Sequence, residues 1–154
     1  MSREKINVVF LDFDGVLSTE RSNFQDEIIN HDAVNNFNTL CLENDLKVVI
    51  SSSWRKYDGY IDLFYSFGID KHIDIIGAIP ITGNGKAFLI KEYIKAHPEI
   101  NKYIILDDVY LGGELNSHLV QTTYSMGFNE RKLKEAVNKL YEDDEKEEEN
   151  KKDK

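Results

Sequence analysis

Two aspartates, Asp12 and Asp14, stand out because they directly follow an apolar run, residues 6–11, that is short enough for a buried strand. In an extended chain, a spacing of two residues turns both side chains to the same side. Gly15 comes next and allows the backbone to turn sharply away. Like charges are costly to bury unless something neutralises them. The pattern therefore predicts a metal cation or a shared proton at this strand end.

Further polar groups follow apolar runs later in the chain. Ser51 and Ser52 come after one run, Asp107 and Asp108 come after another, and Lys86 begins an amphipathic stretch. Acids from two strand ends favour Mg²⁺, which takes hard oxygen ligands and is usually shared with a substrate phosphate. One acid could then attack phosphorus and a second could protonate the leaving oxygen. A hydroxyl and a lysine could hold the phosphoryl oxygens, so the set predicts phosphoryl chemistry.

These groups need a scaffold that brings them together, and strands alternate with helices along the chain. We expect strands at residues 7–11, 46–50, 73–81, 103–106 and 118–122, helices at 33–43, 58–67, 86–97 and 131–141, and a polar loop at 18–30. This alternation predicts an α/β, three-layer, Rossmann-like parallel sheet with helices on both faces. The carboxyl ends of its strands lie along one edge, where the polar groups would gather.

Composition indicates one globular domain, residues 1–140, and a charged tail, residues 141–154. The tail holds eight acids and four lysines, so we expect it to be disordered. The net charge of −9 excludes the basic footprint of a nucleic-acid-binding protein, although a nucleic-acid end could still be a substrate. The single Cys41 fits a reducing compartment, and no apolar run reaches the roughly 20 residues of a membrane span. These features predict a soluble, cytoplasmic protein.

Taken in order, the motifs resemble those of the haloacid dehalogenase-like (HAD) phosphohydrolases. The resemblance runs from about residue 6 to 125. Segments 51–55, 106–108 and 118–122 are also similar to the small HAD domains attached to RNA-repair and other nucleic-acid enzymes. The matching residues are Asp12-Phe13-Asp14-Gly15 for the first motif, Ser51 for the second, Lys86 for the third and Asp107-Asp108 for the fourth.

The resemblance implies a Mg²⁺-dependent phosphatase and a role for each motif residue. Asp12 would be the nucleophile and a Mg²⁺ ligand, and Asp14 the general acid/base and a ligand through its backbone carbonyl. Ser51 would bind the phosphoryl group and Lys86 would neutralise the phospho-aspartate. Asp107 and Asp108 would complete the metal site.

Two further residues near Ser51 have open roles. Ser52 could bind the phosphoryl group in place of Ser51. Arg55 could contact the phosphate or a nucleic acid, or could equally form a surface salt bridge.

The intervals between the motifs, residues 13–50 and 52–85, have no room for a separate cap domain. An open site suits a phosphorylated substrate whose own body excludes water, such as a nucleotide, a nucleic-acid end or a phosphoprotein. The alternatives are a small metabolite phosphate with a cap from a partner subunit, and a non-catalytic module that accepts or binds a phosphate.

Overall fold

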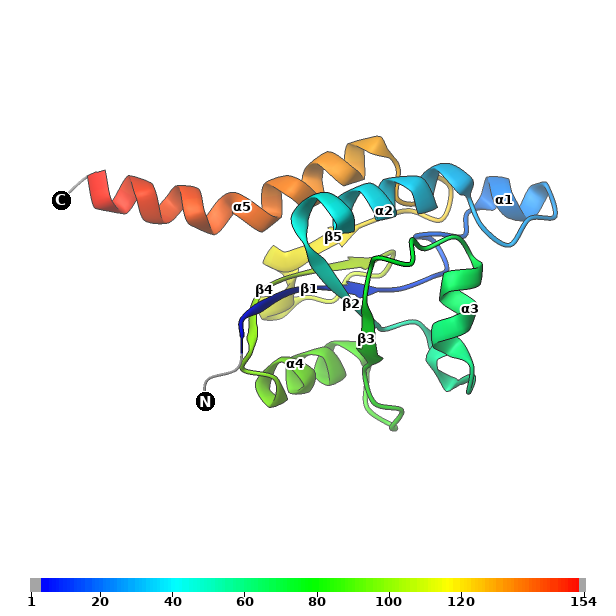
Figure 1. Cartoon of the computed structure of the whole chain (residues 1–154), viewed down its shortest axis with the longest axis horizontal. Helices are drawn as coiled ribbons and strands as arrows, with labels where there is room; N and C mark the ends of the chain where they lie inside the picture. Colours follow the sequence, from blue (N-terminus) through cyan, green and yellow to red (C-terminus); the bar gives the residue numbers. More distant parts are fainter. Residues whose placement is uncertain (1–3, 153–154) are drawn as a thin grey trace.

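The protein folds around a five-stranded parallel sheet with strand order β3-β2-β1-β4-β5 and helices on both faces (Figure 1). The computed structural model describes the backbone of residues 4–152 and the side chains of residues 4–142. This confirms the predicted three-layer α/β fold, and the described residues form no separate cap. The strands are β1 (Ile6–Leu11), β2 (Leu46–Ile50), β3 (Ile75–Ala78), β4 (Ile100–Asp107) and β5 (Leu119–Gln121); the helices are α1 (Glu20–Phe24), α2 (His31–Asn44), α3 (Tyr60–Ser66), α4 (Lys86–Ala96) and α5 (Glu130–Lys152), with short 3₁₀ turns η1 (Ser53–Lys56) and η2 (Gly113–His118).

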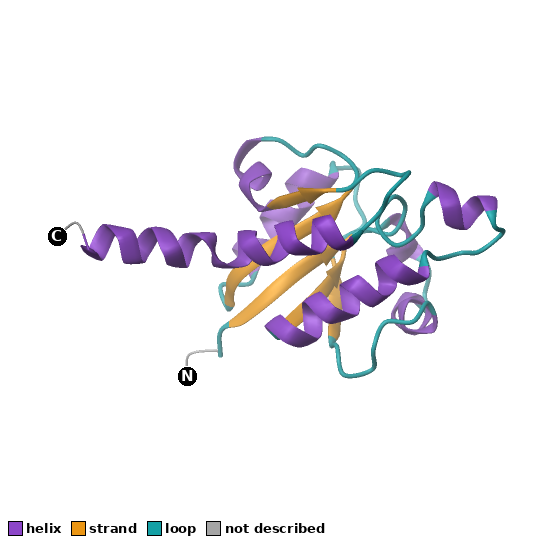
Figure 2. Ribbon diagram, turned by 90° about the horizontal axis from the view of Figure 1, so that it is seen from above, coloured by secondary structure: helices purple, strands orange, loops and turns teal. Residues whose placement is uncertain are grey.

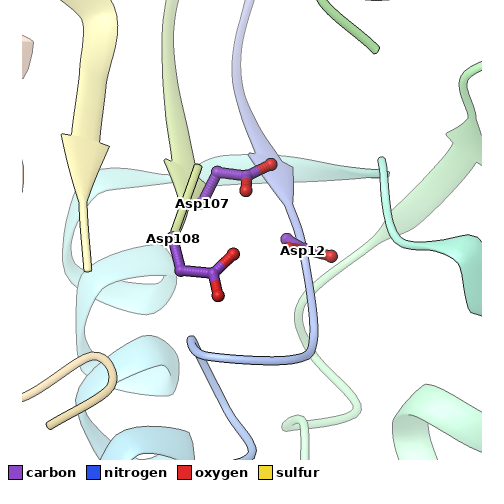
Figure 3. Close-up of side chains that lie close together, drawn as sticks. All are labelled: Asp12, Asp107 and Asp108. Carbon is purple, nitrogen blue, oxygen red and sulfur yellow. The ribbon is translucent and has the colours of Figure 1, made fainter. Parts of the chain in front are cut away.

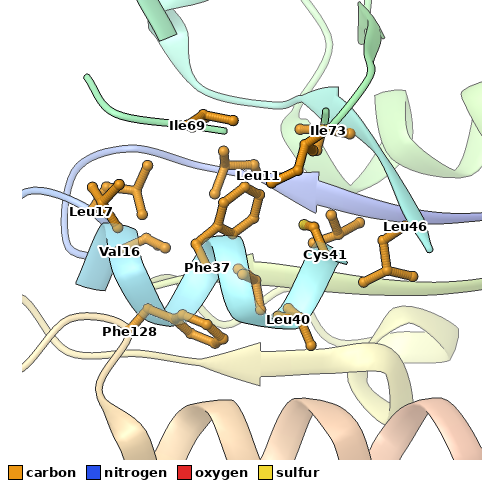
Figure 4. Close-up of a cluster of buried hydrophobic side chains, with 14 of the residues drawn as sticks. Leu11, Val16, Leu17, Phe37, Leu40, Cys41, Leu46, Ile69, Ile73 and Phe128 are labelled. Atoms are coloured by element: carbon orange, nitrogen blue, oxygen red, sulfur yellow. The ribbon is translucent and has the colours of Figure 1, made fainter. Parts of the chain in front are cut away.

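The sheet is buried on both faces, as its uninterrupted apolar strands predict. Val9 and Leu11 of β1 belong to one core cluster, together with side chains from α2, α3 and α5 (Figure 4). Val8 and Phe10 of the same strand belong to a second cluster, with side chains from α4 and η2. Figure 2 shows α5 lying across the strands on the first face. Alternate residues of β1 therefore pack against the helices on the two opposite faces of the sheet.

Local signals in the sequence set most element boundaries. Asn30 caps α2, because its side chain accepts a hydrogen bond from the Ala33 N–H at 3.1 Å. The helix ends at Asp45, which is in the left-handed conformation with φ 51°. Cys41 lies on the buried side of this helix, and burial raises the pKa of its thiol.

Four elements differ from the sequence predictions. The expected loop 18–30 contains α1, because Thr19 and Ser22 form a reciprocal capping box at its start. Strand β3 is shorter than the predicted 73–81. Strand β4 begins earlier, at Ile100, and includes Asp107. Helix α5 continues to Lys152, through part of the segment expected to be a disordered tail, and the domain boundary at residue 140 stays a prediction.

Strand β1 lies in the centre of the sheet, between β2 and β4, so its carboxyl end has a neighbouring strand end on each side. Leu11 is paired with Ile50 of β2 and with Leu106 of β4. The residues that follow these three strands therefore lie at one edge, as the sequence predicts. Within residues 4–152, no helix is long and apolar enough to cross a membrane.

Candidate active site

The first loop turns immediately after Asp12. The Phe13 carbonyl accepts hydrogen bonds from the N–H groups of residues 16, 17 and 18, and Gly15 has φ +79°, a region that favours glycine. As a result Asp12 is 8% exposed, whereas Asp14 is exposed to solvent. An extended chain would turn both side chains to the same side, but the strand ends at Leu11, before the first aspartate. Asp12 is therefore buried while Asp14 faces solvent.

Three carboxylates converge at the edge of the sheet. Asp12 follows β1, Asp107 is the last residue of β4, and Asp108 follows it (Figure 3). Each offers one oxygen to a group whose ligand atoms lie within 4.8 Å of one another. This is a donor set of hard oxygens suited to a divalent cation such as Mg²⁺. The side chain of Asp14 is not part of this group, which leaves its backbone carbonyl as the ligand that the family resemblance implies.

The cluster carries more negative charge than its surroundings neutralise. Burial, with the nearby charge of Asp107, raises the pKa of Asp12 to about 7. Burial and the same neighbour also raise the pKa of Asp108. Asp107 itself is fully buried, with one carboxylate oxygen accepting from the Val109 N–H at 3.1 Å. A cation at this point would stabilise all three ionised carboxylates.

Lys86 reaches the cluster. It is the first residue of α4, and its Nζ lies 2.8 Å from Asp107 Oδ2 and 3.5 Å from Asp12 Oδ2. Burial lowers the pKa of this ammonium, but the opposing attraction of Asp12 and Asp107 outweighs burial, and the net pKa is raised. The two carboxylates also offset the unfavourable position of a cation at a helix N-terminus. The structure thus brings Asp12, Lys86, Asp107 and Asp108 together.

The two serines after β2 have different hydrogen bonds. Ser52 caps η1, since its hydroxyl accepts from the Trp54 N–H at 3.1 Å. Ser51 is fully buried, and its Oγ has no hydrogen-bond partner among the described residues. A buried polar atom without a partner is costly and needs an explanation. A phosphoryl oxygen at this end of β2 would satisfy the Ser51 hydroxyl, which makes Ser51 the better candidate of the two.

Arg55 joins two loops of the site. Its Nε donates to the Ile79 carbonyl at 3.1 Å and its Nη2 to the Pro80 carbonyl at 3.2 Å. Its Nη1 donates to the carbonyls of Ser51 and Ser52 at 3.3 and 3.0 Å. Burial lowers the pKa of this guanidinium, partly offset by the nearby charge of Asp12. These bonds use four of its five N–H groups, so Arg55 mainly ties the loop after β2 to the loop that leads to α4.

The sequence predictions missed the groups that hold the first loop in place. The hydroxyl of Thr122, which is 1% exposed, donates to the Gly15 carbonyl at 2.6 Å. The Phe128 N–H donates to the Val16 carbonyl at 2.8 Å. A Cβ atom at Gly15 would overlap the carboxylate of Asp108. The only sequence signal for this arrangement is a polar residue, Thr122, that directly follows the last strand.

Fold and site together define a capless HAD-like domain, in a superfamily whose activity is of the phosphatase type. Residues 8–133 match the family described as "HAD domain in Swiss Army Knife RNA repair proteins", and the chain belongs to this family. No curated protein and no solved structure matches the chain. The family agrees with the resemblance seen in the sequence, and the cluster of aspartates fits the metal site of such a domain.

Proposed function

We propose that this protein is a Mg²⁺-dependent phosphomonoester hydrolase that works through an aspartyl-phosphate on Asp12. The observation that carries the proposal is the convergence of three carboxylates, the Lys86 ammonium and the unpartnered Ser51 hydroxyl at one edge of the sheet. A purely structural ion cluster would explain Lys86 and Asp107. It would not explain a buried hydroxyl without a partner at the same edge of the sheet as two carboxylates of raised pKa.

Asp12, Asp107 and Asp108 would hold the metal ion, with the backbone carbonyl of Asp14. Bound there, Mg²⁺ supplies neutralising charge for the phosphoryl oxygens and keeps the carboxylates ionised. The raised pKa of Asp12 and of Asp108 supports this assignment, because both shifts reflect negative charge that a cation would balance.

The reaction divides into two displacements at phosphorus. Asp12 attacks through a carboxylate oxygen, the bond to the leaving oxygen breaks, and Asp14 gives its proton to that oxygen. Asp14 then takes a proton from water, which attacks the phospho-aspartate and releases inorganic phosphate together with the regenerated Asp12 carboxylate. Ser51 and Lys86 hold the phosphoryl oxygens throughout.

A nucleotide or a nucleic-acid phosphate is the substrate class that we favour. The described residues form no cap over the site, which favours a substrate whose own body excludes water. The family is that of domains found in RNA repair proteins, which supports a phosphorylated nucleic-acid component.

The test is release of inorganic phosphate from a panel of phosphate esters, with Mg²⁺ and with EDTA. The panel holds an aryl phosphate, ribose 5-phosphate, nucleoside monophosphates, and oligonucleotides with a 5′- or a 3′-phosphate. We expect release that needs Mg²⁺ and that falls at least about 10³-fold in Asp12→Asn. Asp62→Asn, an exposed acid in the first turn of α3, is the matched control. A folded protein that releases phosphate from none of these esters would overturn the proposal and favour a binding module.

A further inference from the structure

A cleft lies beside the aspartate that we propose as the general acid. It is formed between the segment that contains α1 and the start of η1, on the side of Asp14. Its volume is about 340 Å³, which is within the range of ordinary ligand pockets, roughly 300–1,000 Å³. The lining residues include Phe13, Asp14, Asp26, Glu27, Ile28 and Trp54.

The chemistry of Asp14 determines what such a cleft can hold. A general acid must lie within hydrogen-bond reach of the oxygen that it protonates, and that oxygen belongs to the leaving group. The remainder of the leaving group must therefore extend past Asp14, and the cleft is the space that Asp14 lines. We propose that this cleft binds the leaving group as an uncharged nucleoside whose base stacks on Trp54. The inference rests on the proposed function, since it uses Asp14 as the general acid.

Trp54 is a rigid platform rather than a core residue. Its side chain is 41% exposed, while its ring packs edge-on against Phe13 with centroids 6.1 Å apart. Phe13 is in turn stacked on Phe67 at 4.8 Å and packed edge-on against Phe64 at 5.9 Å. An exposed tryptophan held by buried aromatic rings is already ordered before a base stacks on it, which reduces the entropic cost of binding.

Ile28 contributes a second apolar surface to the cleft. It is 64% exposed, although it is a large aliphatic side chain. It lies in the segment that joins α1 to α2, whereas Trp54 lies in η1, so the two apolar side chains line the cleft from different segments. A flat base bound on Trp54 would remove apolar area of both residues from water.

The charge of the cleft restricts its ligand further. The charged side chains among its described lining residues are all acidic: Asp14, Asp26 and Glu27. A second phosphate on the leaving group would be repelled by these carboxylates. Ribose hydroxyls and base amino groups can donate hydrogen bonds to them instead. We therefore expect a nucleoside monophosphate to be preferred over a nucleoside bisphosphate and over a longer phosphorylated chain.

Trp54 provides a binding assay that does not depend on turnover, because it is the single tryptophan of the chain. We expect adenosine, the leaving group without its phosphate, to quench the fluorescence of the wild-type protein with saturation. Ribose serves as the control and should leave the fluorescence unchanged. If adenosine gives no saturable change, the cleft is not a nucleoside site, whether or not the protein is a phosphatase.

The activity assay compares AMP, adenosine 3′,5′-bisphosphate, a 5′-phosphorylated oligonucleotide and ribose 5-phosphate. In the wild type we expect the highest kcat/KM for AMP. In Trp54→Leu the ratio of kcat/KM for AMP to that for ribose 5-phosphate should fall about tenfold, the effect of one lost stacking interaction. Trp54→Phe should retain most of this ratio, since it keeps an aromatic face. Tyr57→Leu, which removes an exposed aromatic outside the cleft, should keep the wild-type ratio.

The results that would contradict this inference differ from those that would contradict the proposed function. An unchanged AMP ratio in a folded Trp54→Leu, or equal kcat/KM for AMP and the bisphosphate, would overturn the inference while the enzyme remains a phosphatase. Absence of Mg²⁺-dependent release from every ester would instead overturn the proposed function, and the adenosine titration would still test the cleft.

Discussion

The two sides of the candidate site are built differently. On the phosphate side, Asp12, Ser51 and Asp107 are buried and lie at the ends of adjacent strands. On the leaving-group side, Asp14 and Trp54 are exposed and come from a loop and a short 3₁₀ turn. Strand register fixes the first set within the core, whereas the second set can change with little effect on the fold. In the proposed function the nucleophile and the metal ligands thus belong to the buried set, whereas the general acid Asp14 and the surface for the leaving group belong to the exposed set.

Replacement of Lys86 should give a large loss of activity on the phosphate side, close to the loss expected for Asp12→Asn. Lys86→Gln removes the cation that contacts Asp107 and Asp12, and we expect kcat to fall by about 10³. Lys95→Gln, an exposed lysine of the same helix, is the matched control. Steady-state kinetics with Mg²⁺ measures both. Similar losses of kcat in the two variants would show that Lys86 has no specific role in holding the phosphoryl group.

Ser51 and Ser52 allow a catalytic effect and a stability effect to be compared within one loop of the phosphate side. Ser51→Ala should lower kcat by about 10² without lowering the free energy of unfolding, because its hydroxyl has no partner to lose. Ser52→Ala should lower the free energy of unfolding by about 1 kcal/mol through loss of the cap on η1, with a smaller effect on kcat. Urea unfolding and kinetics separate the two effects. The opposite pattern would assign the phosphoryl contact to Ser52.

Replacement of Arg55 tests whether the phosphate side depends on the connection between the loop after β2 and the loop that leads to α4. Arg55→Lys cannot hold the carbonyls of both loops, so we expect kcat to fall about tenfold and the free energy of unfolding to fall by about 1–2 kcal/mol. A direct phosphate contact would instead raise KM alone and leave stability unchanged. Measurement of KM, kcat and the urea midpoint distinguishes a loop connection from substrate binding.

The smallest effect concerns the pH dependence of the metal-free protein. The pKa of Asp12 is raised to about 7 and that of Asp108 is raised as well, so between pH 4 and 7 the folded state holds more protons than the unfolded state. Stability should therefore fall as pH rises through this window, lowering Tm by about 5 °C between pH 5 and 8.

Calorimetry with EDTA measures the change, and two controls follow from its cause. Asp12→Asn should flatten the profile because it removes the group with the raised pKa. Mg²⁺ should restore Tm at pH 8 if the carboxylates bind it. A metal-free profile that rises with pH would contradict the electrostatic description of the phosphate side.

The sequence predicts the phosphate side well because buried strands have a strong signal. The apolar run before Asp12 and the run before Ser51 each fix a strand end, and parallel strands must present those ends at one edge. The three-layer fold follows from the same pattern, the HAD-like family is indicated by the resemblance of the motifs, and both are confirmed. The individual catalytic and binding roles stay predictions.

The leaving-group side is much less visible in the sequence. Helix α1 depends on a short capping box in a polar segment, where the apolar periodicity of a longer helix is absent. The bonds from Arg55 to Ile79 and Pro80, and from Thr122 to Gly15, join residues far apart in the chain. Such contacts depend on how loops pack across the sheet, and no local spacing indicates them.

The central position of β1 has a consequence for synthesis of the protein. Chains fold while they are made, from the N-terminus onward, and β1 can pair with β2 as soon as the first 50 or so residues are available. Its other edge remains open until β4 has been translated, and open strand edges are prone to aggregation. The same late strand ends in Asp107, so a nascent chain completes its cluster of carboxylates in the step that pairs the second edge of β1.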